Sequence, residues 1–163
     1  MSAQTLSRLR QHRSLHRERG MAGMLWIFFA VLIVGILGVG FDGALGTYTG
    51  NSVRDILNSA TMNASSQVVT SGRTVVIDKA KAKTKFTTDY SKMRKAYPNI
   101  TKTGNYKLIT FKVSKTRGGT TGNTLTTSVQ ERSQTFFLSV FGKKYYTFTP
   151  VSVARYGAIY ELK

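Results

Sequence analysis

The sequence predicts an α+β protein, in which a single N-terminal transmembrane helix extends into a long amphipathic helix and a small domain follows with one helix packed on an antiparallel β-meander. Three observations predict this class. Residues 21–41 carry no charge, apolar residues then recur at helical spacing, and Thr, Val, Tyr and Phe dominate from Tyr106 onward with glycine at the breaks. We therefore expect four segments: a basic cytoplasmic head at 1–20, the transmembrane helix at 21–42, its amphipathic extension at 43–71 and an exported β-rich domain at 72–163.

The composition excludes several kinds of chemistry. The 163 residues include no cysteine, so the chain has no disulfide framework, no thiolate nucleophile and no cysteine-based zinc or iron–sulfur site. Both histidines, His12 and His16, stand in the basic head, which leaves the rest of the chain without an imidazole for a catalytic triad or a metal. An enzyme would then need a Ser–Lys pair or a carboxylate pair such as Asp78 and Asp89, and no motif distinguishes either. We expect no enzymatic activity, no cofactor, no metal and no small-molecule substrate.

Residues 21–41 are long enough to cross a bilayer. At 1.5 Å per residue, a helix of this length spans roughly 30 Å, the thickness of the hydrocarbon core. A secretory signal peptide has a shorter apolar region of about 7 to 15 residues, so a cleaved leader is the weaker alternative. A buried core helix fits less well, because the stretch is apolar on all sides and the chain has little else to cover it.

The charges that flank this stretch predict its orientation. Of 24 basic and 7 acidic residues, five arginines and one glutamate precede Met21, a net charge of +4, and the remainder of the chain carries +13. Short positive flanks stay in the cytoplasm, whereas long translocated segments have little influence. The arginines concerned are Arg8, Arg10, Arg13, Arg17 and Arg19. We expect a single-pass protein of the cell membrane with a cytoplasmic N-terminus and an extracytoplasmic C-terminal domain.

An amphipathic segment continues the apolar stretch. Its apolar positions, mainly three or four residues apart, are Leu45, Tyr48, Val53, Ile56, Leu57, Ala60, Ala64 and Val68. No proline interrupts this pattern, and Gly72 predicts its C-terminal end. We expect one helix of about 45 to 50 residues, half in lipid and half outside it.

Glycine is frequent along this predicted helix. Gly35, Gly43, Gly46 and Gly50 fall on about the same half of it. Small residues at such spacings let membrane helices approach closely, which predicts a helix-packing face. The alternative is that glycine is simply common in membrane helices.

Asp42 stands at the edge of the apolar stretch and is the only acid between Glu18 and Asp55. A carboxylate at the bilayer centre costs about 2.5 to 3.5 kcal/mol on insertion scales, and at the interface it costs little. We interpret Asp42 as a membrane-edge acid that marks the end of the span. The alternative is a partnered role, such as pairing with an arginine of a neighbouring subunit.

The exported domain is predicted to open with a short strand and a helix. The strand covers Thr74 to Ile77, and Asp78 is a suitable helix N-cap. The apolar residues Phe86, Tyr90, Met93 and Tyr97 have the helical period, and Pro98 ends the helix. A strand through 79–85, where Lys alternates with Ala or Thr, is the competing interpretation.

Five further strands are predicted after Tyr106. Their ranges are 106–113, 124–130, 135–141, 145–153 and 158–162. Gly142 with its neighbours predicts a hairpin between the third and fourth strands, and residues 117–123 predict a looser turn between the first and second. Strands that follow one another so closely favour an antiparallel meander.

The order of these parts has a counterpart in a known family. The sequence RERG at 17–20 precedes the apolar helix, VGFDG at 39–43 ends it, and RDILNSA at 54–60 leads into a segment rich in Ala and Ser. In these features the chain resembles the TadE/TadG-like minor pilins of the tight-adherence (Flp) pilus. That family is a branch of the type IV filament superfamily and has relatives in conjugation-type secretion systems. The resemblance covers roughly residues 13–68 and is looser over 72–97.

The resemblance implies a pilin-like or pseudopilin subunit of an envelope pilus, an adhesion structure, or a secretion or conjugation apparatus. Its partners would be membrane lipid and other pilin or secretion-apparatus subunits, contacted through the N-terminal helix. Family members are cut by a prepilin peptidase, which implies cleavage between Gly20 and Met21. Several members carry Glu at the fifth mature position, where this chain has Leu25, a departure that favours the TadG-like side. Without cleavage, the same segment would be a signal anchor.

Positive charge is concentrated in the exported domain. Residues 73–117 contain 13 Lys and Arg against Asp78 and Asp89. The candidate anion-binding residues are Lys79, Lys81, Lys83, Lys85, Lys92, Arg94 and Lys95. They predict a surface for DNA or an anionic cell-wall polymer, and hence an alternative function as a membrane-anchored extracellular binding or accessory protein. The competing interpretation is a solvated face that keeps the domain soluble.

Overall fold

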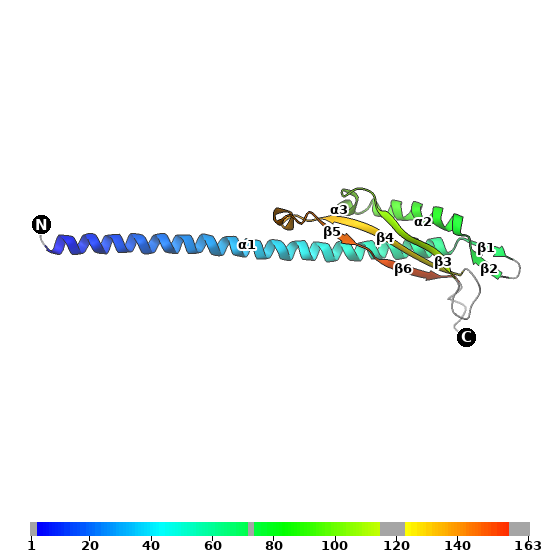
Figure 1. Ribbon diagram of the computed structural model, residues 1–163, viewed down its shortest axis with the longest axis horizontal. Coiled ribbons are helices and arrows are strands. Elements are labelled where there is room, and N and C mark those ends of the chain that lie inside the picture. Colours follow the sequence, from blue (N-terminus) through cyan, green and yellow to red (C-terminus); the bar gives the residue numbers. More distant parts are fainter. Residues whose placement is uncertain (1–2, 72–73, 115–122, 157–163) are drawn as a thin grey trace, which may run out of the picture. The chain divides into compact units, whose positions relative to one another are not determined.

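Figure 1 shows the computed structural model, which describes the backbone of residues 3–71, 74–114 and 123–156 and the side chains of 21–70, 75–114 and 123–156. The chain divides into two compact units, Met1–Phe41 and Asp42–Lys163. Helix α1 (Ala3–Ser65) runs through the first unit and opens the second. The predicted α+β class, with a long N-terminal apolar helix and an antiparallel sheet, is confirmed.

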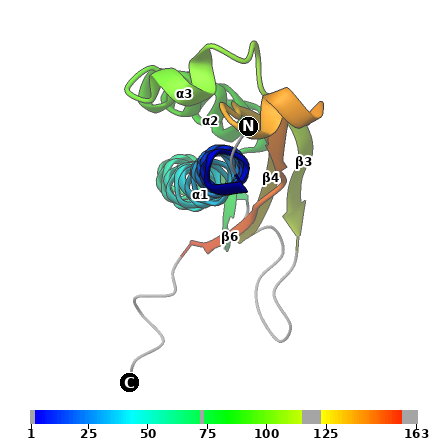
Figure 2. The ribbon, with the colours of Figure 1, turned by 90° about the vertical axis from the view of Figure 1, so that its left-hand side faces the viewer.

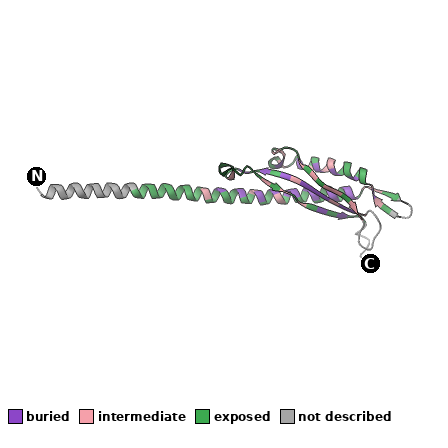
Figure 3. Ribbon diagram, in the orientation of Figure 1, coloured by how far each residue is buried: buried purple, intermediate pink, exposed green. Residues whose placement is uncertain are grey.

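In the first unit, the described apolar side chains of α1 are exposed over most of the helix. From Met21 onward it is the one helix, among the residues described, that is long and apolar enough to cross a membrane. Figure 3 shows the described part of this segment as mostly exposed, and only 6% of its most apolar 18 residues are buried. Large side chains such as Trp26, Phe28 and Leu37 are 77%, 61% and 67% exposed. Length and composition make this segment a candidate for a membrane span or a signal sequence.

An antiparallel sheet forms one layer of the second unit. Strand β4 (Thr124–Gln134) is its centre, and β3 (Lys107–Ser114) pairs with one edge of it. Strands β5 (Tyr145–Phe148) and β6 (Val151–Arg155) both pair with the other edge. The predicted first and second strands are thus confirmed, with β4 longer than expected.

Strands β5 and β6 are two halves of one interrupted strand. Glu131 pairs with Phe148, and Ser128 pairs with Val151. The two pairs are three residues apart on both sides, so the register is the same before and after the interruption. The interruption falls at Pro150 and the residue before it, because proline has no N–H for the ladder. The predicted strand over 145–153 is therefore found in two pieces that keep a single register.

The helices cover one face of this sheet (Figure 2). On α1 the predicted apolar positions Val53, Leu57 and Ala60 are fully buried and join a core that includes Phe86 of α2 (Lys79–Arg94) and Leu125 of β4. A hydrogen bond of 2.6 Å between the hydroxyls of Thr61 and Thr127 ties α1 to β4. The apolar period of residues 53–64 thus marks a sheet-facing side, and not only a helix.

The predicted extension of the helix to residue 71 is wrong at its end. Helix α1 stops at Ser65, and β1 (Val68–Ser71) pairs antiparallel with β2 (Thr74–Ile77). Val68 opens a run of β-branched residues that favours a strand, and it faces Ile77 in this hairpin. The predicted strand at 74–77 is confirmed.

The helical interpretation of residues 79–97 is confirmed over most of its length. Asp78 is the N-cap of α2, and its Oδ1 accepts from the backbone N–H groups of Ala80 at 3.0 Å and Lys81 at 3.1 Å. The helix ends at Arg94, and the short α3 (Pro98–Thr101) follows with its proline in the first turn, where no N–H is needed.

The strand expected over 135–141 is wrong. A 3₁₀ turn, η1 (Leu138–Phe141), lies there, and Gly142 ends it at a φ of 85° that favours glycine. The backbone N–H of Thr135 donates to the carbonyl of Lys144 at 3.1 Å, which closes β4 onto β5 at this point. The expected strand at 158–162 and most of the expected turn at 117–123 lie outside the described residues.

Candidate functional site

The first residue of the second unit, Asp42, holds a loop of the β-rich domain. Its Oδ1 accepts from the backbone N–H of Phe136 at 2.9 Å, and its Oδ2 accepts from the N–H of Leu138 at 2.7 Å. The Asp42 side chain is buried, so these charge-assisted bonds compensate for the water it has lost. Neither the membrane-edge acid nor the intersubunit ion pair expected from the sequence included this intramolecular role.

Two of the four glycines predicted to pack helices lie against the sheet of the same chain. A Cβ added at Gly46 would come within 3.1 Å of the Tyr146 ring, and one at Gly50 within 3.1 Å of the Phe148 ring. Both glycines therefore let β5 approach α1 closely. Gly43 is different, because nothing lies within 4 Å of a Cβ there, and the same is true of Gly35 in the first unit.

A groove of about 580 Å³ runs along this glycine side of α1, within the second unit. Helix α1 contributes one wall, and β5 with Pro150 contributes the other. Its lining residues are Gly43, Gly46, Thr47, Gly50, Asn51, Arg54, Tyr146, Thr147, Phe148, Thr149 and Pro150. Arg54 is the only charged side chain among them, and none is a carboxylate, an imidazole or a thiol. The groove thus offers shape and hydrogen bonds, but no acid–base pair.

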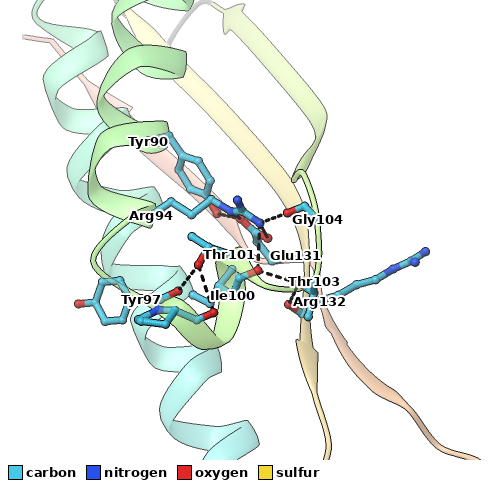
Figure 4. A network of polar contacts seen from close by, with 10 residues as sticks. Tyr90, Arg94, Tyr97, Ile100, Thr101, Thr103, Gly104, Glu131 and Arg132 are labelled. Carbon is cyan, nitrogen blue, oxygen red and sulfur yellow. Dashed lines mark hydrogen bonds and ion pairs between the residues drawn. The ribbon is translucent and has the colours of Figure 1, made fainter.

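Arg94, predicted to bind anions, is instead buried in the domain, which corrects that prediction. Its Nε donates to Oε1 of Glu131 at 2.7 Å, and its Nη2 donates to Oε2 at 3.2 Å. The same Nη2 donates to the backbone carbonyls of Ile100, at 3.1 Å, and Gly104 (Figure 4). The guanidinium therefore fastens α2 to β4 and to the segment after α3, and its burial removes it from the surface that an external anion could reach.

Glu131 is the second half of this network. Tyr90 donates its hydroxyl to Oε1 of Glu131 at 3.1 Å, and both side chains are buried. Burial raises the pKa of the Glu131 carboxyl, while the Arg94 hydrogen bonds and charge oppose that shift. Burial, followed by the charge of Glu131, raises the pKa of the Tyr90 hydroxyl. The network is a bidentate ion pair between Arg94 and Glu131, to which the Tyr90 hydroxyl adds a third donor. These contacts stabilise the fold of the domain.

The other predicted anion-binding residues are exposed on α2. Four of them share the face opposite the buried Phe86 and are here called the lysine face: Lys81, Lys85, Lys92 and Lys95. The charges of two of these lysines are partly neutralised by ion pairs. Lys81 Nζ lies 3.8 Å from Oδ2 of Asp78, and Lys85 Nζ lies 3.1 Å from Oδ1 of Asp89. Lys79 and Lys83 are also exposed, but the helical period places them on the side of Phe86, away from this face. Of the seven basic residues predicted to bind anions, Arg94 is thus buried in an ion pair with Glu131, and the six lysines are exposed with part of their charge neutralised.

Several predicted residues lie where no side chain is described. The orienting arginines at 8, 10, 13, 17 and 19 and the junction residue Gly20 are in the helical backbone of α1, but outside the residues with described side chains. Met21 opens the described segment and is exposed. In the portion whose side chains are described, no group of three or more His, Asp or Glu residues could hold a metal ion.

Sequence reasoning missed Glu131 and the loop that Asp42 holds. Glu131 lies in a strand otherwise rich in Thr and Ser, and a lone acid there is ordinarily placed on the solvent side. One signal was present, since an Arg on the apolar side of a predicted helix needs a buried acid as a partner. Comparisons with protein-family models, with curated proteins and with solved structures found no match.

Proposed function

We propose that this chain is a non-enzymatic, membrane-anchored pilin-like subunit, of the minor-pilin or pseudopilin kind, that assembles into an envelope pilus or a secretion or conjugation apparatus. The observation that carries the proposal is the uncovered apolar helix of residues 21–41. Soluble monomers seldom expose apolar patches larger than a few hundred Å². Such a helix needs lipid before assembly and apolar neighbours after it.

The glycines support assembly through this helix. Among the described residues of the first unit, no atom lies within 4 Å of a Cβ at Gly35 or Gly40, so these positions of the helix are open. Small residues at open positions of an apolar helix permit close contact between helices. Gly46 and Gly50 serve the domain instead, so the proposed intersubunit face is the part of α1 around Gly35, Gly40 and Gly43.

The absence of catalytic groups from the groove beside Gly46 and Gly50 supports a structural function. Its lining has one arginine and no general base, nucleophilic thiol or carboxylate pair. The buried Arg94–Glu131 pair fastens elements of the domain together.

Cell fractionation and N-terminal sequencing test the proposal. In cells that produce the whole system, filaments are sheared off and the remaining membranes are washed with alkaline carbonate. We expect the chain in the sheared filaments, with Met21 as its first residue, and a membrane pool that resists carbonate. A protein found only in the membrane, with Met1 intact, would be an anchored accessory protein and would contradict the pilin-like part. Release by carbonate would contradict the anchor as well.

The lysine face favours a second candidate, an anchored protein that binds DNA or an anionic wall polymer. Binding that depends on phosphate contacts weakens steeply with salt. Full-length protein in detergent micelles can be titrated with labelled duplex DNA at low ionic strength, with a variant that carries Gln at all four positions of the lysine face as the control. Tight binding that the variant loses would establish this candidate, and equal weak binding by both proteins would exclude it.

A further inference from the structure

We propose that residues 136–144, here called the interfacial loop, insert into the membrane surface on the domain's side and give the β-rich domain a second lipid contact. The inference rests on the membrane anchor proposed above. It commits to one occupant for the loop's exposed apolar residues, namely a bilayer that contains anionic lipid.

The position of the loop follows from covalent structure and two hydrogen bonds. Asp42 is the residue directly after the uncharged stretch, so its Cα is about 3.8 Å from that of Phe41. Its carboxylate accepts from the backbone N–H of Phe136 at 2.9 Å and from that of Leu138 at 2.7 Å. The headgroup region is roughly 5 to 8 Å deep on each side of the hydrocarbon. A loop held within one side chain of the end of the span therefore lies at this depth.

The loop carries the apolar residues that such a depth requires. Val140 is 81% exposed and Phe141 is 74% exposed, and both belong to the η1 turn. Phe136 is 57% exposed and Phe137 is 41% exposed. Aromatic and aliphatic residues on a short projecting turn are suited to the boundary between headgroups and acyl chains. On a domain surrounded by water, the same residues would form an exposed apolar patch.

The charge next to the loop fits anionic headgroups. Lys143 and Lys144 follow η1 directly and are exposed, with Lys143 Nζ 4.9 Å from the centre of the Tyr146 ring. No acidic residue lies between Glu131 and Glu161 in the sequence. Lysines beside a membrane surface attract anionic lipid, and their long stems can follow the apolar boundary.

Depth measurement in bilayers tests the inference, and the chain suits it because it has no native cysteine. Single cysteines at Val140, Leu32 and Val151 are labelled with a spin probe in the full-length protein. Leu32 lies in the apolar stretch, and Val151 is an exposed apolar residue of β6 that serves as the matched control. The proteins are reconstituted in nanodiscs of phosphatidylcholine with or without phosphatidylglycerol, and accessibility to oxygen and to a water-soluble nickel reagent gives the depth of each probe.

We expect the Leu32 probe in the hydrocarbon, the Val140 probe about 5–10 Å below the headgroup surface, and the Val151 probe in water. Replacing Lys143 and Lys144 by Gln should make the Val140 probe shallower in discs with phosphatidylglycerol, and should remove the difference between the two lipid compositions. A Val140 probe in water, with Leu32 in hydrocarbon, overturns the inference and leaves the anchor intact. A Leu32 probe in water overturns the anchor itself. A Val140 probe that is shielded from both reagents and becomes exposed at one protein per disc overturns the lipid contact in favour of a second copy of the chain.

Discussion

At the scale of single residues, two buried carboxylates accept hydrogen bonds that connect distant segments of the second unit. Asp42 accepts two backbone N–H bonds from a loop distant in sequence, and Glu131 accepts from Arg94 and Tyr90. Both acids are almost completely buried. A buried acid is costly unless its oxygens are satisfied, so each of these side chains constrains the segments that supply its donors.

Replacing Asp42 by Asn tests the first constraint. The amide keeps one acceptor oxygen but brings an NH₂ group toward a backbone N–H, so one of the two bonds is lost together with the charge. We expect the free energy of unfolding to fall by about 1–3 kcal/mol. Denaturant unfolding in detergent measures this loss, and amide exchange at Phe136 and Leu138 should accelerate. Asp55→Asn, at an exposed position of α1, is the control, and an equal effect of both changes would contradict the role of Asp42.

Replacing Arg94 by Met tests the buried pair. The change leaves the Glu131 carboxylate buried without a cation, which we expect to cost about 3–5 kcal/mol of unfolding free energy at neutral pH. Glu131→Leu in the same chain removes the orphaned charge, so the double variant should be more stable than Arg94→Met alone. Thermal or denaturant unfolding of the two variants decides the point. A double variant no more stable than the single one would exclude charge burial as the cause.

The same pair predicts a dependence on pH. Burial raises the pKa of Glu131 in the folded protein, so folding favours its protonated form, and this group destabilises the fold as pH rises from about 4.3, the ordinary value, to the raised value. Arg94 opposes the shift, so its loss should move the folded pKa further upward. The stability difference between wild type and Arg94→Met should therefore grow with pH above about 4 and then level off. Unfolding curves measured across this range check the sign, and parallel pH profiles would contradict it.

At the scale of elements, α1 has two kinds of glycine. Gly46 and Gly50 allow rings of β5 to touch the helix, while Gly43 has open space around it. Gly50→Val would push the Phe148 ring away and should destabilise the domain by about 1–3 kcal/mol. Gly43→Val is the matched control, and it should be neutral or slightly stabilising because glycine is a poor helix former. Denaturant unfolding in detergent compares the two variants, and equal values for both would show that the contact with β5 is unimportant.

The helices and the longer strands were predictable because local patterns determine them. The period of residues 53–64 results from burial of one helix face, and the N-cap at Asp78 results from hydrogen bonds to backbone N–H groups two and three residues away. Strands β3 and β4 follow from a local composition rich in Thr and Val. The failures have long-range causes. The run FFLSVF at 136–141 has the composition of a strand, but it forms a turn whose amides bond to Asp42, which is more than 90 residues away in sequence. Similarly, the partner of Arg94 lies 37 residues beyond it.

At the scale of the whole molecule, the net charge of +17 divides into parts with different consequences. Five arginines stand before the apolar helix, while the lysines of α2 decorate the surface of the second unit. Orientation in a membrane depends on short flanking segments, and long translocated segments count for little. Removing the same number of charges from the N-terminal segment and from α2 should therefore change the membrane orientation by unequal amounts.

Exchanging charges at both places tests this expectation. Replacement of all five arginines at 8–19 by Gln should produce a mixed orientation, with part of the protein holding its C-terminal domain inside. Replacement of five α2 lysines by Gln should leave the orientation unchanged. Those lysines are Lys79, Lys81, Lys83, Lys85 and Lys92. Protease digestion of intact spheroplasts measures the exposed fraction of the domain, and a uniform orientation of the arginine variant would contradict the prediction.

Two of the hydrogen-bonded attachments of α1 to the rest of the second unit, at Asp42 and Thr61, have a mechanical consequence. Asp42 is bonded to the loop after β4, and Thr61 is bonded to Thr127 within β4, so the attachment points are 19 residues, or about 28 Å, apart along the helix. Tension that pulls on α1 along its axis loads both attachments and the packed side chains between them at the same time. Because these contacts share the force, they must break together, which takes more force than breaking the same bonds one after another. A filament or membrane that pulls on the helix would therefore load the domain along the whole segment of α1 from Asp42 to Thr61.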